Sequence, residues 1–184
     1  MRMRRAGNSF LAAGLALVIA ALGQYGYMLF RQEQLRSEWK RQAIGKPQPQ
    51  QDRLRLIRLK IPAIHLDDIV VPGDGYRALL EGPEWLPQSA RAGTQGNMVI
   101  AGHRDTFFRR LHAVRPGTLL LVQTNGRNFT YRVAWKKIIS PRDTEVLRRG
   151  HRARVTLITC YPTYWIGPAP HRLVVRAHLI ITQQ

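Results

Sequence analysis

The sequence predicts an all-β domain, a closed or nearly closed β-barrel with short helices, preceded by one N-terminal transmembrane helix. Three observations carry this prediction. Seven short apolar segments lie between turn residues, as the strands of a barrel do. Asn125-Gly126 stands between two of these segments and is the strongest signal for a tight β-hairpin. Residues 10–30 contain no charged side chain, which indicates a membrane segment.

Residues 10–30 are expected to form a single-pass transmembrane anchor. As a helix these 21 residues span about 30 Å, which matches the hydrocarbon core of a bilayer. Residues 1–9 carry three arginines, which favours a cytoplasmic N-terminus. A cleaved signal peptide is the alternative, because Ala21-Leu22-Gly23 resembles a cleavage site. The apolar run continues to Phe30, however, which is longer than an ordinary signal core. Both interpretations place the rest of the chain outside the cytoplasm.

Residues 31–51 are expected to be a polar juxtamembrane helix that ends in a stiff, proline-containing spacer at 46–51. The folded domain then occupies residues 52–184. Within it, short helices are expected near residues 77–80, 106–111 and 144–147.

Each expected strand has its own signal in the sequence. The first has apolar residues near every second position, and Pro62 ends it. The second closes with the turn sequence PGDG, and the third runs into His103. The fourth and fifth are joined by the Asn-Gly hairpin. The last two flank a loop with three prolines and a glycine, which excludes regular structure there. The strands are expected at residues 54–61, 66–71, 97–102, 118–124, 128–139, 153–159 and 173–181.

The chain is strongly basic, with a formal net charge of +18, and 24 of its 29 basic residues are arginine. Such a surface attracts polyanions such as nucleic acid, anionic lipid head groups or anionic wall polymers. The basic residues are spread along the chain and form no dense block. We therefore expect a solvated basic face beside an anionic membrane, and no specific nucleic-acid partner.

Cys160 is the one cysteine of the chain. Exported proteins usually use cysteines in pairs, as disulfides, so an unpaired one suggests a working thiol. Cys160 lies at the end of one predicted strand, directly after residue 159; His103 directly follows another, and Arg172 directly precedes the next. A histidine can deprotonate or stabilise a nucleophilic thiol, and an arginine can hold the oxyanion that develops when the thiol attacks a carbonyl.

Each of these residues alone has an ordinary structural explanation. A single cysteine in a strand is usually a small core residue, a histidine after Ala-Gly can be a loop residue, and an arginine at a strand start is usually solvated. Their shared position at strand ends favours a common site at one end of the barrel. Asp105 is a candidate to orient His103, although pairing with Arg104 is the favoured interpretation.

Three segments resemble the motifs of sortases. They are GNMVIAGHRDTFFRRL at residues 96–111, TLITCYP at residues 156–162, which matches the TLxTC motif, and APHRLVVRA at residues 169–177. The resemblance is to class D sortases and the related proteobacterial class, and it covers residues 53–181 together with the anchor. As a set, in this order and spacing, the three motifs are highly specific.

The resemblance implies an eight-stranded sortase-type barrel and a transpeptidation. Cys160 would attack the Thr–Gly carbonyl of an LPXTG-like C-terminal sorting signal on a protein substrate and form a thioester. His103 would protonate the departing amine and later deprotonate the incoming amine acceptor. Arg172 would hold the substrate carbonyl or oxyanion.

Further site residues are less clearly marked. Thr159 and Tyr161 flank the cysteine and His171 adjoins the arginine, so these three are candidates for substrate binding. The remaining histidines have spacings that indicate no metal site. Some sortases use calcium held by carboxylates, but this domain has few acidic residues in the corresponding half, so we expect no calcium requirement and no other cofactor.

Two other functions are compatible with parts of the pattern. L,D-transpeptidases also combine histidine, cysteine and arginine, but their signature places Ser-x-Gly-Cys almost beside the arginine, whereas here Thr159 precedes Cys160 and the arginine is twelve residues on. A basic membrane-tethered scaffold that binds anionic envelope polymers would leave the shared position of His103, Cys160 and Arg172 unexplained. The arginine-rich composition and the proteobacterial resemblance favour an inner membrane with the catalytic domain in the periplasm.

Overall fold

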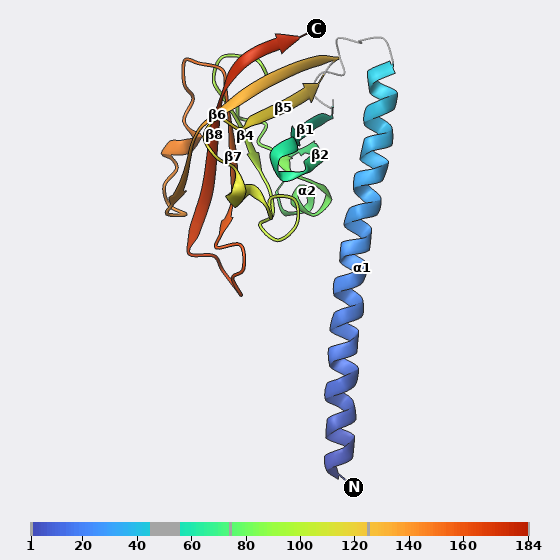
Figure 1. Cartoon of the computed structure of the whole chain (residues 1–184). Helices are drawn as coiled ribbons and strands as arrows, with labels where there is room; N and C mark the ends of the chain where they lie inside the picture. Colours follow the sequence, from blue (N-terminus) through green and yellow to red (C-terminus); the bar gives the residue numbers. More distant parts are fainter. Residues whose placement is uncertain (1, 45–55, 74, 125, 184) are drawn as a thin grey trace.

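A long helix and a β-barrel make up the protein (Figure 1). The computed structural model describes residues 2–44, 56–73, 75–124 and 126–183. Helix α1 (Arg2–Ile44) is continuous, so the expected membrane segment and the expected juxtamembrane helix are one helix without a break. The expected spacer at 46–51, the start of the first predicted strand and Asn125 lie outside the described residues.

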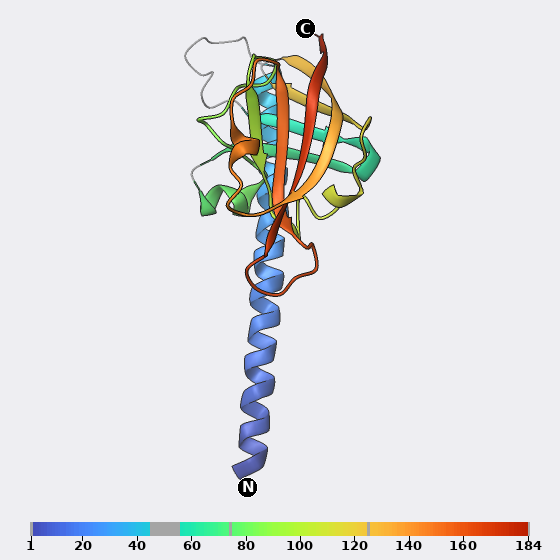
Figure 2. The same cartoon turned by 90° about the vertical axis from the view of Figure 1, so that its left-hand side faces the viewer.

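Eight strands close into a barrel in the order β1-β2-β3-β4-β7-β8-β6-β5, which confirms the predicted fold class (Figure 2). All neighbours are antiparallel except β2–β3 and β4–β7. The strands are β1 (Ile57–Ile61), β2 (Leu66–Pro72), β3 (Glu84–Trp85), β4 (Asn97–Ala101), β5 (Leu119–Thr124), β6 (Arg127–Ile139), β7 (Arg154–Tyr161) and β8 (His171–Gln183). Short helices lie between them: η2 (Pro62–Ile64), α2 (Tyr76–Glu81), η3 (Leu111–Ala113) and η4 (Glu145–Leu147).

The sequence-based assignment differs from the structure in three elements: strand β3, the short helix η2 and the helix expected at 106–111. Strand β3 was not predicted, because two residues are too short to show alternation. The helix expected at 106–111 is a series of turns that leads into η3. The amide of Phe108 donates to the carbonyl of His103, five residues back, so no regular helix forms there. The ring of Phe108 instead packs where a Cβ on Gly102 would stand.

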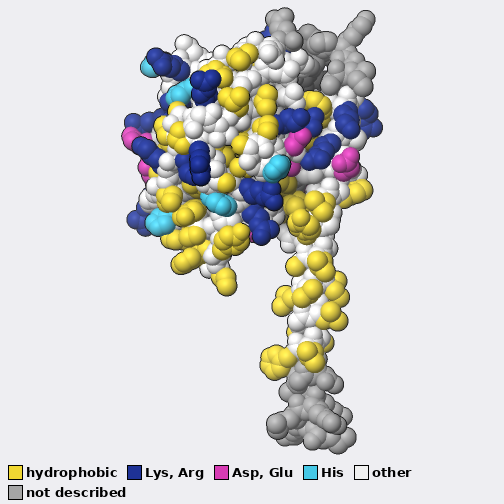
Figure 3. Space-filling view, in the orientation of Figure 1, with side chains coloured by type: hydrophobic (Ala, Val, Ile, Leu, Met, Phe, Trp, Pro, Cys, Tyr) yellow, Lys and Arg dark blue, Asp and Glu magenta, His cyan; other side chains and the backbone are white. Residues whose placement is uncertain are grey.

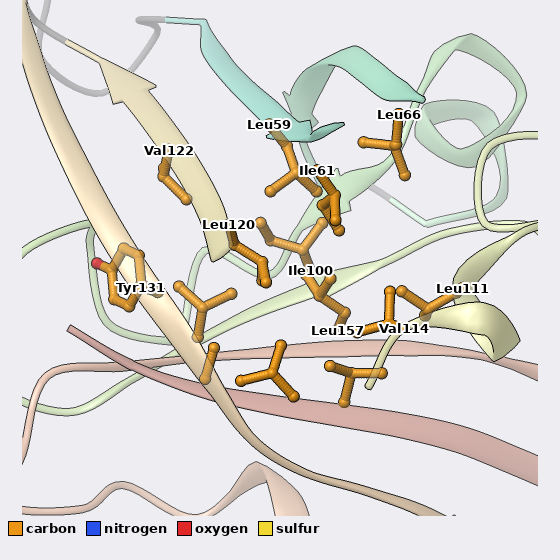
Figure 4. Close-up of a cluster of buried hydrophobic side chains, with 14 of the residues drawn as sticks. Leu59, Ile61, Leu66, Ile100, Leu111, Val114, Leu120, Val122, Tyr131 and Leu157 are labelled. Carbon is orange, nitrogen blue, oxygen red and sulfur yellow. The ribbon is translucent and has the colours of Figure 1, made fainter. Parts of the chain in front are cut away.

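The core fills the inside of the barrel with aliphatic side chains from facing strands (Figure 4). Leu59 and Ile61 of β1, Ile100 of β4, Leu120 of β5 and Leu157 of β7 are all fully buried. Because successive side chains of a strand point to opposite faces, this inward set fixes which residues of β7 and β8 face outward.

Helix α1 is fixed to the outside of β2 by a buried glutamine. Gln32 is 5% exposed. Its Nε2 donates to the carbonyl of Ile69 at 3.1 Å, and its Oε1 accepts from the amide of Ile69 at 3.0 Å. The same Nε2 donates to the carbonyl of Glu81 at 2.7 Å, at the end of α2. A single side-chain amide thus satisfies backbone groups of both a strand and a helix, which makes the docking specific.

Apolar and charged contacts extend this docking along α1. Leu35 is buried in a second cluster that includes Leu56, Ile69, Val71 and Ala78. The guanidinium of Arg58 lies 5.0 Å from the ring centre of Trp39, and Arg31 forms an ion pair with Glu81 at 2.8 Å. The N-terminal part of α1 projects beyond the barrel, and the apolar side chains of its described residues are exposed (Figures 1 and 3). By length and hydropathy, α1 is a candidate to cross a membrane.

The contact between α1 and β2 includes the carboxyl group of Asp68, whose ionisation costs free energy because the group is largely buried. Burial raises the pKa of Asp68 to about 6; the charge of Arg36 opposes this shift, and the neighbouring Asp67 adds to it. The folded pKa lies above the unfolded value, so the stability this group contributes is greatest below about pH 4 and is lost as the pH rises towards 6.

We therefore expect Asp68→Asn to stabilise the full chain by about 1–2 kcal/mol at pH 7.5 and to have no effect below about pH 4. Denaturant unfolding of both proteins in detergent at the two pH values measures this difference. A destabilised variant at pH 7.5 would show that the Arg36–Asp68 attraction outweighs the cost of burying the charge.

Candidate active site

The ladder between β7 and β8 places Cys160 directly opposite Arg172. Directly opposite residues of an antiparallel pair share one face of the sheet. Leu157 and Leu173 belong to the core inside the barrel, so alternation puts Cys160 and Arg172 on the outer face. Cys160 is a free, partly exposed thiol. A partly exposed thiol and a cation therefore lie side by side on the outer face of the sheet.

His103 is brought to the same place by the parallel ladder between β4 and β7. The ladder ends with Ala101 beside Ile158, and the amide of Gly102 then donates to the carbonyl of Ile158 at 3.1 Å. Continued by two positions beyond the ladder, the same register places His103 beside Cys160. The three residues thus come from one end of three adjacent strands, β4, β7 and β8.

The guanidinium of Arg172 is held by the loop that precedes it. Its Nη1 donates to the carbonyls of Ala169 at 3.2 Å and His171 at 3.0 Å. No other acceptor contacts it within the described part of the chain. Its Nε and Nη2 groups are therefore free to donate to a ligand.

Arg104 joins the two loops that carry the site. Its Nη2 donates to the carbonyls of Trp165 at 2.8 Å and Gly167 at 3.0 Å, so the segment after β4 is tied to the β7–β8 loop (residues 162–170). The favoured pairing of Arg104 with Asp105 is wrong, because no ion pair joins them in the described structure. The partners are backbone carbonyls of a distant loop, which no sequence pattern reveals.

A sequence comparison identifies the chain. Residues 59–180 match the family model described as the sortase domain. The chain belongs to the sortase family. Sortase D of Bacillus subtilis (strain 168) is 32% identical over 118 residues, which cover 64% of this chain and 60% of that protein. The chain therefore spans somewhat less than two thirds of the length of this relative.

Solved structures agree with this assignment. The sortase C-1 structure from Actinomyces oris has a TM-score of 0.63 and 30% identity, over 68% of this chain and 73% of that one. The Clostridium perfringens sortase D5 transpeptidase has a TM-score of 0.71 over 82% of this chain and 98% of that one; at 21% identity it supports the fold alone. The expected sortase barrel is confirmed, and the family is one of cysteine transpeptidases.

In this sortase the three further candidate residues have different surroundings. Thr159 is 4% exposed, and its hydroxyl donates to the carbonyl of Gly102 at 2.7 Å. That bond fixes the residue just before His103, so Thr159 is placed to position the histidine. Tyr161 is partly buried and packs on the core, and His171, its partner across the ladder, is exposed.

Sequence reasoning missed the residues that fasten the β6–β7 loop (residues 140–153) over the outer face. The Nδ2 of Asn97 donates to the carbonyl of Val146 at 2.9 Å, and Arg176 donates to the same oxygen. The hydroxyl of Thr156 donates to Oδ1 of Asn97 at 2.6 Å. Burial, together with the charge of Arg154, lowers the pKa of Arg176 to about 10. The signal available in the sequence was a polar asparagine, Asn97, at the start of an otherwise apolar strand.

A cavity of about 340 Å³ lies between α1 and the site. Its lining includes Tyr25 and Met28 of α1, Leu80 of α2, and His103 and Thr106. The histidine of this sortase therefore lies beside the last apolar turns of helix α1. Among the described residues, no group of three or more histidine, cysteine or acidic side chains could hold a metal ion.

Proposed function

We propose that the chain is a membrane-anchored cysteine transpeptidase that cleaves an LPXTG-like C-terminal sorting signal and transfers the protein to an amine acceptor. The observation that carries this proposal is the placement of Cys160 opposite Arg172, with His103 next to them in the continued register. The family assignment supports the reaction class. The site offers a thiol that can act as nucleophile, a histidine that can carry a proton, and an arginine that can donate hydrogen bonds to an oxyanion.

In the first half-reaction the thiolate of Cys160 attacks the carbonyl carbon of the Thr–Gly bond. The oxygen becomes an oxyanion, which the fixed fork of Arg172 stabilises. The C–N bond then breaks, and His103 donates a proton to the departing glycine amine. The products are a thioester on Cys160 and the released C-terminal fragment.

In the second half-reaction an amine attacks the thioester carbonyl. His103 accepts a proton from this amine, the C–S bond breaks, and the thiolate of Cys160 is regenerated. A thioester suits this step because it resists water while it remains reactive towards amines. One amide bond is exchanged for another, so the reaction needs neither an oxidant nor a metal, and we propose that it requires no calcium or other cofactor.

The exposed apolar part of α1 supports a single-pass anchor. With Arg2, Arg4 and Arg5 on the cytoplasmic side, the barrel lies outside the cytoplasm. We place the enzyme in the inner membrane of a bacterium with a periplasm.

Mass spectrometry of the full chain in detergent tests the proposal. The protein is mixed with an LPXTG-type peptide, with and without an added amine. We expect an adduct on Cys160 that carries the N-terminal fragment of the peptide and that the amine releases as a new amide. A folded protein that forms no adduct with such peptides, and whose Cys160 is inert to a general thiol reagent, would contradict it and favour the scaffold alternative.

Arg172→Lys is expected to lower kcat/KM by about 10²–10³, because a single ammonium group cannot contact the loop carbonyls and the oxyanion in the geometry of a planar fork. Arg132→Lys is the matched control, since Arg132 is exposed on β6 and pairs with His178 far along β8 from the site. Peptide-cleavage kinetics of both variants measure the effect, and a fully active Arg172→Lys enzyme would remove Arg172 from the mechanism.

A further inference from the structure

The tip of the β7–β8 loop exposes three large apolar side chains in succession. Tyr164 is 79% exposed, Trp165 is 48% exposed and Ile166 is 100% exposed. We propose that this loop tip (residues 164–166) inserts into the outer interface of the membrane that α1 crosses, as a second membrane contact. The inference rests on the proposed anchoring of α1.

The loop tip points in the direction in which α1 leaves the barrel. Both views show the β7–β8 loop extending beyond the strands towards the N-terminus of α1 (Figures 1 and 2). Figure 3 shows hydrophobic side chains gathered at this end of the barrel. A bilayer crossed by the projecting part of α1 therefore faces this end.

The orientation is fixed, because α1 is docked through Gln32 and Leu35 and cannot swing freely against the barrel. The cavity between α1 and the site is lined by Ala21, Tyr25 and Met28 on one side and by His103 on the other. The end of the barrel thus lies level with the last turns of the apolar run.

Because the barrel end lies at this height along α1, the membrane-spanning segment must lie closer to the N-terminus than the expected residues 10–30. Residues 6–24 are 19 consecutive uncharged residues and reach about 28 Å as a helix, close to the thickness of a hydrocarbon core. Tyr25 and Tyr27 then lie in the interface, where tyrosine and tryptophan are enriched. The expected span at 10–30 would carry the site end of the barrel into the hydrocarbon layer, whereas the span at 6–24 leaves it at the surface.

The loop tip is built to leave water at low cost. Polar backbone groups that enter an apolar environment need internal partners. The carbonyls of Trp165 and Gly167 accept from Arg104, and the indole Nε1 of Trp165 donates to the carbonyl of Pro168 at 3.0 Å. Two carbonyls of the loop and the indole N–H of Trp165 are therefore satisfied within the protein, while the Tyr164 and Ile166 side chains remain exposed and free to insert.

The charges around the loop suit an anionic bilayer surface. The guanidinium of Arg109 lies 5.9 Å from the ring centre of Tyr164, and a second arginine, Arg110, follows Arg109 in the chain. Residues 161–171 contain no acidic side chain. Basic and aromatic residues together are typical of protein segments that lie in the interface of anionic membranes.

Depth measurements on the full chain in nanodiscs of anionic lipid test the insertion. Single cysteines are introduced as Ile166→Cys or, for control, Ile181→Cys, in a Cys160→Ala background, and labelled with an environment-sensitive fluorophore. Ile181 is the matched control because it is also an exposed isoleucine, but at the far end of β8. We expect lipid-borne quenchers to quench the label at 166 and not at 181, and aqueous iodide to do the reverse.

Equal quenching of both labels by iodide would overturn the proposal. A chain that does not enter the discs would overturn the anchor and the insertion together. The labels need no catalysis, so this measurement can succeed even if the proposed reaction fails.

An activity measurement shows whether the loop tip contacts lipid or the protein substrate. With Cys160 intact, Ile166→Asp is expected to lower the turnover of a substrate tethered in the same nanodisc several-fold and to leave the turnover of a short soluble peptide unchanged. Ile181→Asp should change neither. An equal loss with the soluble peptide would assign the loop tip to substrate binding and overturn the membrane contact.

Discussion

Cys160→Ala is expected to abolish acyl transfer while the barrel stays folded. The variant removes the sulfur atom on which the thioester is proposed to form, so we expect the rate to fall by at least about a thousandfold. The thiol is partly exposed on the outer face and lies outside the core cluster. Its loss should change stability by no more than about 0.5 kcal/mol.

The rate of amide exchange and the thermal transition of the same preparation measure the two expectations together. Cys160→Ser is a useful companion, because it replaces the thiol with a hydroxyl of similar shape, which is a far weaker acid and which His103 would have to activate. Residual activity near the wild-type value in the alanine variant would place the nucleophile elsewhere. Loss of the thermal transition would show that the thiol is structural.

His103→Ala is expected to lower the rate of acylation by about 10²–10⁴, because the departing amine must leave as a poor anion without a proton donor. The size of the loss should depend on the leaving group. A substrate with an ester in place of the scissile amide needs little proton donation, so the variant should recover most of its acylation rate with that substrate.

Single-turnover acylation with the amide and the ester, for wild type and variant, measures this dependence. His112→Ala is the control, since His112 is an exposed histidine of η3 outside the site. An equal loss with both substrates would assign His103 to positioning or thiol activation in place of proton donation to the leaving group.

Much of the barrel could be predicted from the sequence because its strands are long enough to show alternation and are bounded by proline, glycine and the Asn-Gly turn. The outward position of Cys160 and Arg172 follows from the same alternation once their ladder is known. The sequence alone indicated that these residues lie at the same end of the barrel. Their direct pairing could not be predicted, because it depends on the register between β7 and β8, which is set by the closure of the whole sheet.

The contacts that orient the site could not be predicted, because they join side chains to backbone groups far along the chain. In the sequence Gln32 is one of several glutamines in a polar segment, and nothing marks it as special. In the structure its hydrogen bonds to Ile69 and Glu81 hold α1 to the barrel. The sequence suggests that Arg104 pairs with its neighbour Asp105, but in the structure it donates hydrogen bonds to a loop about sixty residues away. Strand β3 is too short for any periodicity. In each case tertiary structure supplies the partner.

The unbroken course of α1 from the apolar run to its docking site on β2 has a consequence for substrate choice. A catalytic domain on a flexible tether samples many heights above a bilayer, whereas a domain fixed to a stiff helix keeps its nucleophile at one height. If α1 anchors the enzyme as proposed, a membrane-held substrate would reach Cys160 only if the stretch between its scissile bond and its own membrane segment had the matching length. Spacer length would thus select substrates alongside the sorting motif itself.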